Sequence, residues 1–267
     1  MKSVKELLSE HGLNPNKALG QNFLSDGAAI ERIAALASEP GLPIIEIGPG
    51  LGAITLPLAE TGLPLAAIEL DRALCGVLEG LLPANASVVN ADVLKADLEG
   101  IAERLGGEIT VCGNLPYYIT SPTVMRLVSS KLPIRRMVLM MQKEAADRFF
   151  AEPGSKNYGP LTVLSRLRYE IRTALELSPA SYFPQPEVSS SVLVFDRNGA
   201  ETPEGLETLL KCAFRMRRKT LANNLSGMGL ARTDAAELIN RAGLAPSVRA
   251  EALSPEDFVR LCGLLPR

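Results

Sequence analysis

Short apolar segments alternate with stretches of helical periodicity between residues 43 and 142, and this alternation restricts the possible folds more than any other feature of the sequence. We expect strands at residues 43–48, 65–70, 87–91, 109–113 and 137–141. We expect helices at residues 54–60, 73–82, 98–105 and 123–130. Such alternation is typical of an α/β domain built on a parallel sheet.

The pattern changes after residue 142. Residues 171–177 and 191–195 are predicted strands, and the simplest interpretation of the proline-rich segment between them is a hairpin that closes the sheet. From about residue 203 helical periodicity dominates, and no further strand is expected. The sequence therefore predicts an α/β domain over residues 1–198 and a small all-helical domain over residues 199–267.

Composition narrows the classes of protein and of site. The four cysteines lie far apart and form no C-x-x-C pair, so we expect neither a disulfide framework nor a bound metal. The single histidine, His11, lies in a segment flanked by glycine and asparagine and is a poor candidate for a catalytic base. The first ten residues do not resemble a secretory signal, and no apolar run approaches the ~20 residues of a membrane span, so we expect a cytoplasmic protein.

Charge is unfavourable for general binding to a polyanion, because the formal net charge is −2 and the pI is near 5.7. A nucleic acid would therefore have to bind a local basic patch. One basic segment contains five cations and no acid within nine residues: Lys211, Arg215, Arg217, Arg218 and Lys219. On a helix, Lys211, Arg215 and Arg218 would share a stripe, whereas Arg217 would fall near the apolar face and brace the domain. An ordinary solvated basic surface is the alternative.

The first predicted strand runs into a glycine-rich turn, Glu46-Ile-Gly48-Pro-Gly50-Leu-Gly52. Glycines at this place let a ligand lie against the backbone at the carboxyl edge of a sheet. The same residues approximate a dinucleotide-binding fingerprint, so the motif alone leaves the cofactor open. Pro49 disfavours a dinucleotide, because it has no N–H to offer a pyrophosphate.

Acidic residues end the next two predicted strands. Glu69, followed by Leu70, is placed to bind a ribose, and Asp92, followed by the apolar Val93, is placed to accept a hydrogen bond from an adenine amino group. Taken alone, either acid is equally well explained as the N-cap of a helix.

The fourth predicted strand ends in Asn114-Leu115-Pro116-Tyr117, a combination that indicates chemistry at an amine. The exocyclic amine of adenine is a poor nucleophile, because its lone pair is delocalised into the ring. Two acceptors could draw its N–H groups out of the ring plane: the Asn114 side-chain oxygen and the Leu115 carbonyl, on a turn stiffened by Pro116. Tyr117 could then stack on the base. A polar turn after a buried strand is the alternative.

Together these residues resemble the bacterial small-subunit ribosomal RNA adenine N6,N6-dimethyltransferases, the KsgA/RsmA family. The resemblance covers nearly the whole chain and rests on residues 20–24, 46–52, 114–117, 142–144, 158–159, 183–186 and 217–221. It implies a Rossmann-like S-adenosylmethionine-dependent methyltransferase fold with a small all-helical C-terminal domain.

The resemblance also implies roles for individual residues. The implied cofactor-binding residues, for S-adenosylmethionine, are Gln21, Asn22, Leu24, Glu46, Gly48, Gly50, Glu69, Leu70, Asp92, Val93 and Asn114. The implied catalytic residues are Asn114, Leu115, Pro116, Tyr117 and Phe183. Phe183 would face Tyr117 and hold a flipped adenine between two rings, a contact worth about 1–3 kcal/mol per base. The alternative for Phe183 is a loop anchor in the core.

The implied substrate is a pair of adjacent adenosines in a hairpin near the 3′ end of 16S rRNA, each dimethylated at N6 during biogenesis of the small ribosomal subunit. The basic segment 211–219 would contact RNA phosphates. We expect a monomer. A nicotinamide oxidoreductase would leave residues 114–117 and the basic segment unexplained. A non-catalytic ribosome-assembly factor would not need Asn114, Tyr117 and Phe183, and residues 217–221 disfavour a related antibiotic-resistance methylase of large-subunit RNA.

Overall fold

The computed structural model describes residues 3–266 and contains two compact units. The first comprises the chain up to Ala146 together with Ile171–Arg197. The second comprises Asp147–Glu170 together with the chain from Asn198 onward. The chain returns to the second unit at Asn198, and one earlier segment also belongs to that unit.

The segment Asp147–Glu170, which the sequence analysis placed in the first domain, packs in the second unit. Within that unit the Tyr158 hydroxyl donates a hydrogen bond of 2.7 Å to the Leu253 carbonyl. The Tyr158 ring centroid lies 6.2 Å from that of Phe214. A division of the sequence at one residue assigns this segment to the first domain. The apolar residues against which the segment packs come much later in the chain.

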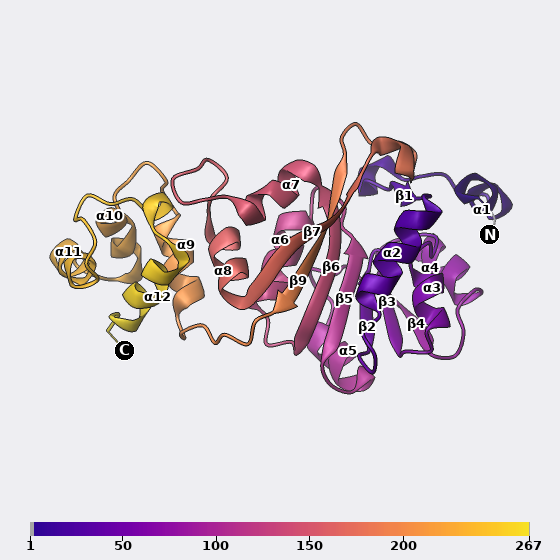
Figure 1. Ribbon diagram of the computed structural model, residues 1–267, viewed down its shortest axis with the longest axis horizontal. Coiled ribbons are helices and arrows are strands. Elements are labelled where there is room, and N and C mark those ends of the chain that lie inside the picture. Colours follow the sequence, from indigo (N-terminus) through magenta and orange to yellow (C-terminus); the bar gives the residue numbers. More distant parts are fainter. Residues whose placement is uncertain (1–2, 267) are drawn as a thin grey trace. The chain divides into compact units, whose positions relative to one another are not determined.

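A seven-stranded sheet forms the first unit's frame, in the order β4-β3-β2-β5-β6-β9-β7 (Figure 1). Its strands are β2 Ile44–Ile47, β3 Leu65–Glu69, β4 Ala86–Asn90, β5 Ile109–Asn114, β6 Ile134–Gln142, β7 Tyr169–Leu177 and β9 Ser190–Arg197. Strands β4, β3, β2, β5 and β6 pair in parallel, and β9 pairs antiparallel with β6. The predicted parallel α/β sheet with two closing strands is confirmed.

Burial on both faces of the sheet explains why the sequences of the inner strands are almost entirely apolar. Every residue of β2 and β3 is buried, as expected of a parallel sheet covered on both faces. The helices of this unit between the strands are α2 Gly27–Ala37, α3 Thr55–Glu60, α4 Arg72–Glu79, α5 Leu98–Leu105 and α6 Thr120–Ser129. Asp26, Asp71 and Asp97 cap the amino ends of α2, α4 and α5 through their side chains.

The order of the strands places the site. From β2 the chain builds β3 and β4 on one side, then returns to build β5 on the other. The carboxyl ends of these strands therefore meet at a switch point, where open α/β sheets bind ligands. The glycine turn and the polar residues that end β3, β4 and β5 lie at this edge.

A second, two-stranded sheet is absent from the sequence predictions. Strand β1, Phe23–Leu24, pairs antiparallel with β8, Tyr182–Phe183, which lies in the segment expected to be only a loop. Helix α1, Val4–Glu10, begins with a capping box formed by Ser3 and packs its apolar side chains into the same cluster as Phe23 and Phe183. The amino-terminal segment is thereby joined to the proline-rich loop.

Helices make up the part of the second unit that follows residue 198, over the residues described. They are α9 Leu206–Ala213, α10 Leu221–Leu225, α11 Arg232–Arg241 and α12 Pro255–Gly263. The segment Asp147–Glu170 contributes α8, Pro160–Arg168, to the same unit. A short α7, Lys143–Asp147, follows β6. From residue 198 to residue 266, the last one described, the chain forms no strand, in agreement with the sequence prediction.

The predicted helix through the basic segment is wrong, because α9 ends at Ala213 and residues 214–219 form a turn. The buried side chain of Asn224 holds this turn, accepting from the Met216 N–H and donating to the Met216 carbonyl, both at 3.1 Å. The Met216 N–H thus binds a side-chain oxygen in place of the backbone carbonyl four residues earlier that it would bind in a continuing helix.

Within residues 3–266, no helix combines the length and hydropathy needed to cross a membrane. Over the same residues, no cluster of three or more His, Cys, Asp or Glu side chains is arranged to hold a metal ion. The four cysteines are free thiols.

Candidate active site

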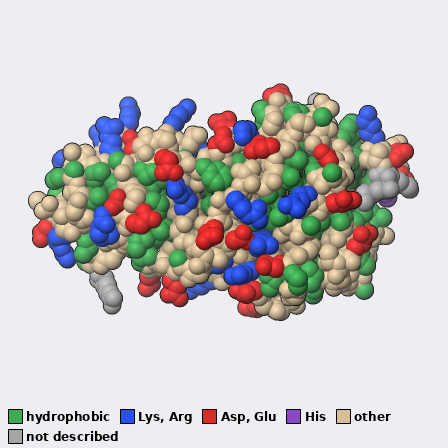
Figure 2. Space-filling view, viewed as in Figure 1, with side chains coloured by type: hydrophobic (Ala, Val, Ile, Leu, Met, Phe, Trp, Pro, Cys, Tyr) green, Lys and Arg blue, Asp and Glu red, His purple; other side chains and the backbone are tan. Residues whose placement is uncertain are grey.

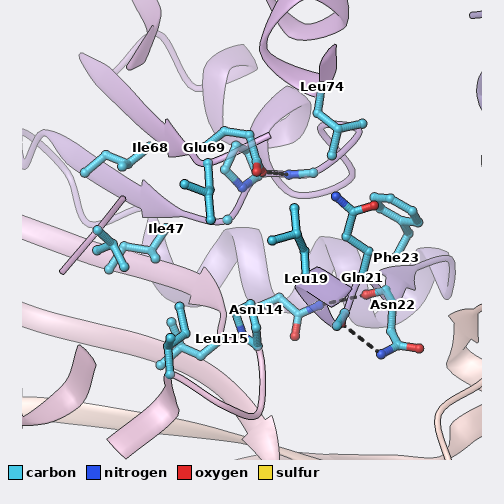
Figure 3. A pocket seen from close by; sticks show the side chains of 18 of the residues that line it. Leu19, Gln21, Asn22, Phe23, Ile47, Ile68, Glu69, Leu74, Asn114 and Leu115 are labelled. Carbon is cyan, nitrogen blue, oxygen red and sulfur yellow. Dashed lines mark hydrogen bonds between the residues drawn. The ribbon is translucent and has the colours of Figure 1, made fainter. Parts of the chain in front are cut away.

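A cavity of about 300 Å³ opens at the carboxyl edge of the parallel strands. It collects segments far apart in the sequence: the region around β1, the glycine turn and the ends of β3, β4 and β5 (Figure 3). The predicted residues that line it are Gln21, Asn22, Leu24, Glu46, Gly48, Gly50, Glu69, Leu70, Asp92, Val93, Asn114, Leu115, Pro116 and Tyr117. Among the predicted cofactor-binding and catalytic residues, Phe183 is the one that does not line the cavity.

The glycine turn is shaped by backbone conformations that other residues rarely adopt. Gly48 and Gly50 have φ values of 69° and 60°. A Cβ on Gly48 would lie 3.3 Å from the Asn114 carbonyl oxygen, and one on Gly50 would lie 3.1 Å from the Phe23 ring. Both glycines therefore allow close packing around the cavity.

The N–H groups of the three turn glycines all donate within the protein. Gly48 donates to the Ile68 carbonyl and Gly52 to the Pro49 carbonyl, both at 3.0 Å. Gly50 donates to Glu69 Oε2 at 3.1 Å. A phosphate-binding turn needs such amides free, so this geometry opposes the dinucleotide alternative.

Glu69 connects the two turns that follow β2 and β3. Besides the contact with Gly50, its Oε1 accepts from the Asp71 N–H at 2.8 Å. Burial raises the pKa of Glu69 against the lowering effect of these backbone hydrogen bonds. The N-cap alternative does not describe Glu69, because the residue that caps α4 is Asp71, which accepts from Ala73 N–H.

Glu46 lies at the end of β2 and is only 1% exposed. Its Oε2 has no hydrogen-bond partner among the described residues. Burial raises the pKa of Glu46 to about 8, with a smaller opposing effect from Thr55 and a further increase from Glu69. The carboxyl group is therefore mostly neutral at pH 7.

Asp92 begins the loop that follows β4. Its Oδ1 accepts from the Leu94 N–H at 2.9 Å, and its Oδ2 lies 3.6 Å from Lys95 Nζ. The guanidinium of Arg126, on α6, donates to the carbonyls of Val93 and Ala96 and so fixes this loop. The cavity wall at this loop therefore combines the polar residue Asp92 with the buried apolar residue Val93.

Asn114 has a defined orientation. Its Nδ2 donates to the backbone carbonyl of Asn22 at 3.1 Å, and Asn22 Nδ2 in turn donates to the Gly20 carbonyl at 3.1 Å (Figure 3). With the amide nitrogen engaged, Oδ1 is the end of Asn114 that can accept from a ligand. The Leu115 N–H donates to the Met140 carbonyl at 2.9 Å, which anchors the following residue to β6.

The two aromatic residues predicted to sandwich a base have different surroundings. Tyr117 lines the cavity and is 37% exposed. Burial raises the pKa of Tyr117, with a smaller lowering effect from the Gln142 and Ser190 side chains. Phe183 packs instead in the apolar cluster of α1 and β1, with Lys5 Nζ 5.0 Å from its ring centroid. The structure thus matches the loop-anchor alternative for Phe183, and the sandwich stays a prediction.

Sequence reasoning missed two residues that support the site. A Cβ on Gly113, in β5, would lie 2.5 Å from the Ile47 carbonyl oxygen, so glycine lets the two central strands approach. Asn90 Nδ2 donates to the carbonyls of Glu69 and Leu70, at 2.9 and 3.1 Å. The sequence does contain a signal for Gly113, because a glycine inside an otherwise apolar strand indicates a close approach of the backbone. The sequence contains no such signal for Asn90, because the strand that Asn90 contacts is known only from the order of strands in the sheet.

A model of the ribosomal RNA adenine dimethylase family matches residues 12–266. The chain belongs to this family. It is 39% identical to the ribosomal RNA small subunit methyltransferase A of Magnetococcus marinus, over 97% of this chain and 94% of the relative. It is 40% identical to the protein of the same name from Desulfitobacterium hafniense, over 92% of this chain and 91% of the relative.

Two solved structures of other proteins share the fold. A dimethyladenosine transferase from Plasmodium falciparum matches with a TM-score of 0.72 and 22% identity, over 90% of this chain and 95% of that one. The 23S rRNA methyltransferase ErmE matches with a TM-score of 0.64 and 27% identity, over 91% of this chain and 99% of that one. The predicted Rossmann-like methyltransferase fold is therefore confirmed.

The basic segment of this dimethylase family member is solvent-exposed. Lys211 lies on α9, and Arg215, Arg218 and Lys219 lie in the turn after it. Figure 2 shows Lys and Arg side chains projecting from the edge of the region that contains α9 and α10. Arg217 differs, because it donates to the Lys156 carbonyl at 2.8 Å and approaches Glu251 Oε2 at 3.4 Å. These two contacts connect the turn to the segment 147–170 and to Glu251 within the second unit.

Proposed function

We propose that this protein transfers methyl groups from S-adenosylmethionine to the N6 amino nitrogens of two adjacent adenosines in a hairpin near the 3′ end of 16S rRNA, dimethylating both. The names of the curated relatives support small-subunit rRNA as the substrate class. The observation that carries the chemistry is the orientation of Asn114, whose Nδ2 is held by Asn22 so that Oδ1 can accept from an amine.

The cavity fits S-adenosylmethionine better than a dinucleotide. The turn glycines leave no side chain between the ligand and the backbone, while their N–H groups are engaged within the protein. Glu46 Oε2, buried and without a hydrogen-bond partner among the described residues, is a suitable partner for the amino group of a methionine moiety, whose positive charge would favour the ionised carboxylate. Glu69 and Asp92 line the remainder of the cavity, where a ribose and an adenine would lie.

When bound, S-adenosylmethionine supplies an electrophilic methyl group on a sulfonium. Asn114 Oδ1 and the Leu115 carbonyl would accept the two N–H groups of the target amine and free its lone pair from the ring. Tyr117 would stack on the flipped base. Positioning and fixed dipoles supply the rate, and the displaced proton is lost to solvent after transfer.

RNA binding is assigned to the exposed cations Lys211, Arg215, Arg218 and Lys219, with Arg217 as a brace that keeps the turn in place. A local patch is required because the net charge of the chain is −2. The proposal includes a cytoplasmic location, where small ribosomal subunits would be met, and a monomer that uses no metal ion.

The decisive experiment supplies labelled S-adenosylmethionine together with undermethylated small ribosomal subunits and maps the label by nucleotide. We expect two methyl groups on each of two adjacent adenosines of 16S rRNA. Undermethylated large subunits serve as the matched control and should remain unlabelled. Label on large-subunit RNA, or on neither subunit, would overturn the substrate assignment.

A further inference from the structure

The loop after β4 forms a tight turn, residues 92–96, whose N–H groups bond to its first residue. The Leu94 N–H donates to Asp92 Oδ1 at 2.9 Å, and the Ala96 N–H donates to the Asp92 carbonyl at 2.8 Å. Val93 and Ala96 are buried, at 6% and 8% exposed. Their carbonyls need donors from outside the turn, because an unpaired buried carbonyl is costly.

Arg126 supplies a donor to each of these two carbonyls. It lies in α6, and its Nη1 donates to the Val93 carbonyl and its Nη2 to the Ala96 carbonyl, each at 2.5 Å. A planar guanidinium suits two acceptors at a fixed spacing better than a single ammonium group does. Arg126 does not itself line the cavity, so it acts on a ligand through the residues that it holds.

Helix α6 is also attached to the turn that follows β5. The hydroxyl of Thr120, in the first turn of α6 and 2% exposed, donates to the Pro116 carbonyl at 3.1 Å. Arg126 comes later in the same helix, about 9 Å further along its axis. One helix therefore holds two parts of the cavity wall, the Asn114–Tyr117 turn and the turn 92–96.

We propose that Arg126 is a positioning residue that fixes the turn 92–96, so that Asp92 can accept a hydrogen bond from the adenine amino group of the cofactor. The inference rests on the proposed function, in which Asp92 meets this adenine. Without the guanidinium, two buried carbonyls lose a donor and the turn samples other conformations, and ordering it then opposes cofactor binding. Arg126 thereby sets the selectivity for adenine over a base without the amino group.

Two ligands, S-adenosylhomocysteine and S-inosylhomocysteine, test this selectivity. The inosine compound carries a carbonyl oxygen in place of the adenine amino group, so Asp92 would face an acceptor. Calorimetric titration of the parent should give about tenfold or more higher affinity for the adenine compound. Asp92→Asn keeps an oxygen for the Leu94 N–H but replaces the second carboxylate oxygen by a donor, and it should abolish this preference.

Arg126→Met keeps the apolar stem of the side chain and removes the guanidinium. It should lower the affinity for S-adenosylhomocysteine about three- to tenfold and reduce the preference over S-inosylhomocysteine by a similar factor. The KM for S-adenosylmethionine should rise in proportion. The kcat at saturating cofactor should stay within about twofold of the parent, because the adenine contact does not change during methyl transfer. Arg126→Lys, which restores one donor centre, should fall between the parent and Arg126→Met.

Arg136→Met is the matched control. Arg136 lies in β6 of the same unit, and its guanidinium donates to the Leu36 carbonyl at 3.4 Å and to the Asp196 carboxylate at 2.6 Å. Its side chain is 24% exposed and does not line the cavity. Urea unfolding should show lower stability in both Met variants, because each loses hydrogen bonds of a guanidinium. Arg136→Met should keep the parent's ligand affinities and preference.

The preference between the two ligands separates positioning from general loosening. Loss of the preference in Arg126→Met and Asp92→Asn, with Arg136→Met like the parent, supports the inference. An equal loss of affinity for both ligands in Arg126→Met, or a loss of preference in Arg136→Met as well, overturns the inference and leaves the proposed function in place. If the parent binds neither compound, or shows no preference that Asp92→Asn removes, the adenine contact of the proposed function fails, and the inference fails with it.

Discussion

At the scale of single residues, Asn114 shows how a neighbour decides which end of an amide is available. An isolated asparagine presents either its nitrogen or its oxygen, and here the Asn22 carbonyl engages the nitrogen. We expect Asn114→Ala to reduce the methyl-transfer rate by about two orders of magnitude or more, with a much smaller change in cofactor affinity. Single-turnover kinetics and calorimetric titration would measure the two quantities.

Asn85→Ala is the control for this variant. Asn85 also binds backbone carbonyls through its amide, those of Ala59 and Leu63, but it does not line the cavity. Its replacement should leave the rate of methyl transfer close to that of the parent. Near-normal turnover in Asn114→Ala would remove Asn114 from the proposed mechanism.

Glu46 should make the stability of the protein depend on pH. Its pKa is raised from 4.5 in the unfolded chain to about 8 in the folded protein, so the folded state binds the proton more tightly. The free energy of unfolding should therefore fall as pH rises from about 5 to 8, by up to ~1.4 kcal/mol per pH unit from this group. Urea unfolding of the parent and of Glu46→Gln should show a steeper decrease in the parent.

Glu60→Gln is the matched control for the pH experiment, because Glu60 is an exposed glutamate at the end of α3. This variant should retain the parent's pH dependence. Identical pH slopes in the parent and in Glu46→Gln would contradict the assigned protonation of Glu46.

At the scale of elements, Glu69 joins two turns that would otherwise be independent. One carboxylate accepts from Gly50 after β2 and from Asp71 after β3. We expect Glu69→Ala to weaken cofactor binding strongly and to lower the rate at saturating cofactor much less, because a ribose contact does not change during methyl transfer. Calorimetric titration of the variant showing the parent's affinity would contradict this.

The basic segment shows where prediction of elements by periodicity fails. Lys211, Arg215 and Arg218 have helical spacing, yet α9 ends at Ala213. The competing interaction is the pair of hydrogen bonds between Asn224 and the Met216 backbone. Periodicity indicates which side chains could share a helix face. It does not reveal that the side chain of Asn224, later in the chain, forms hydrogen bonds with the Met216 backbone and so ends the helix.

At the scale of the whole molecule, the chain carries a net charge of −2, so RNA binding is assigned to the one basic segment, residues 211–219. If Lys211, Arg215 and Arg218 contact phosphates, changing all three to Ala should weaken binding to small subunits. The slope of log affinity against log salt should fall by roughly 0.7–0.9 per lost contact, and cofactor binding should be unchanged. Filter binding at several salt concentrations would measure the slope.

A control of equal charge uses Arg32, Lys131 and Arg135, which are exposed in the first unit. Changing these three residues to Ala should leave the salt slope close to that of the parent. The assignment of the RNA-binding surface fails if the two triple variants behave alike.

The sequence by itself determined the order of strands and helices in the seven-stranded sheet, the residues that end its parallel strands and the family. These are local properties, since strand and helix periods and turn glycines depend on neighbouring residues. Tertiary structure alone decided which groups meet. It brought the Gly50 N–H to Glu69, turned the Asn114 amide toward Asn22 and packed Phe183 in the apolar cluster of α1 and β1. Each contact joins residues distant in sequence, and only the packed sheet brings them within hydrogen-bonding or packing distance.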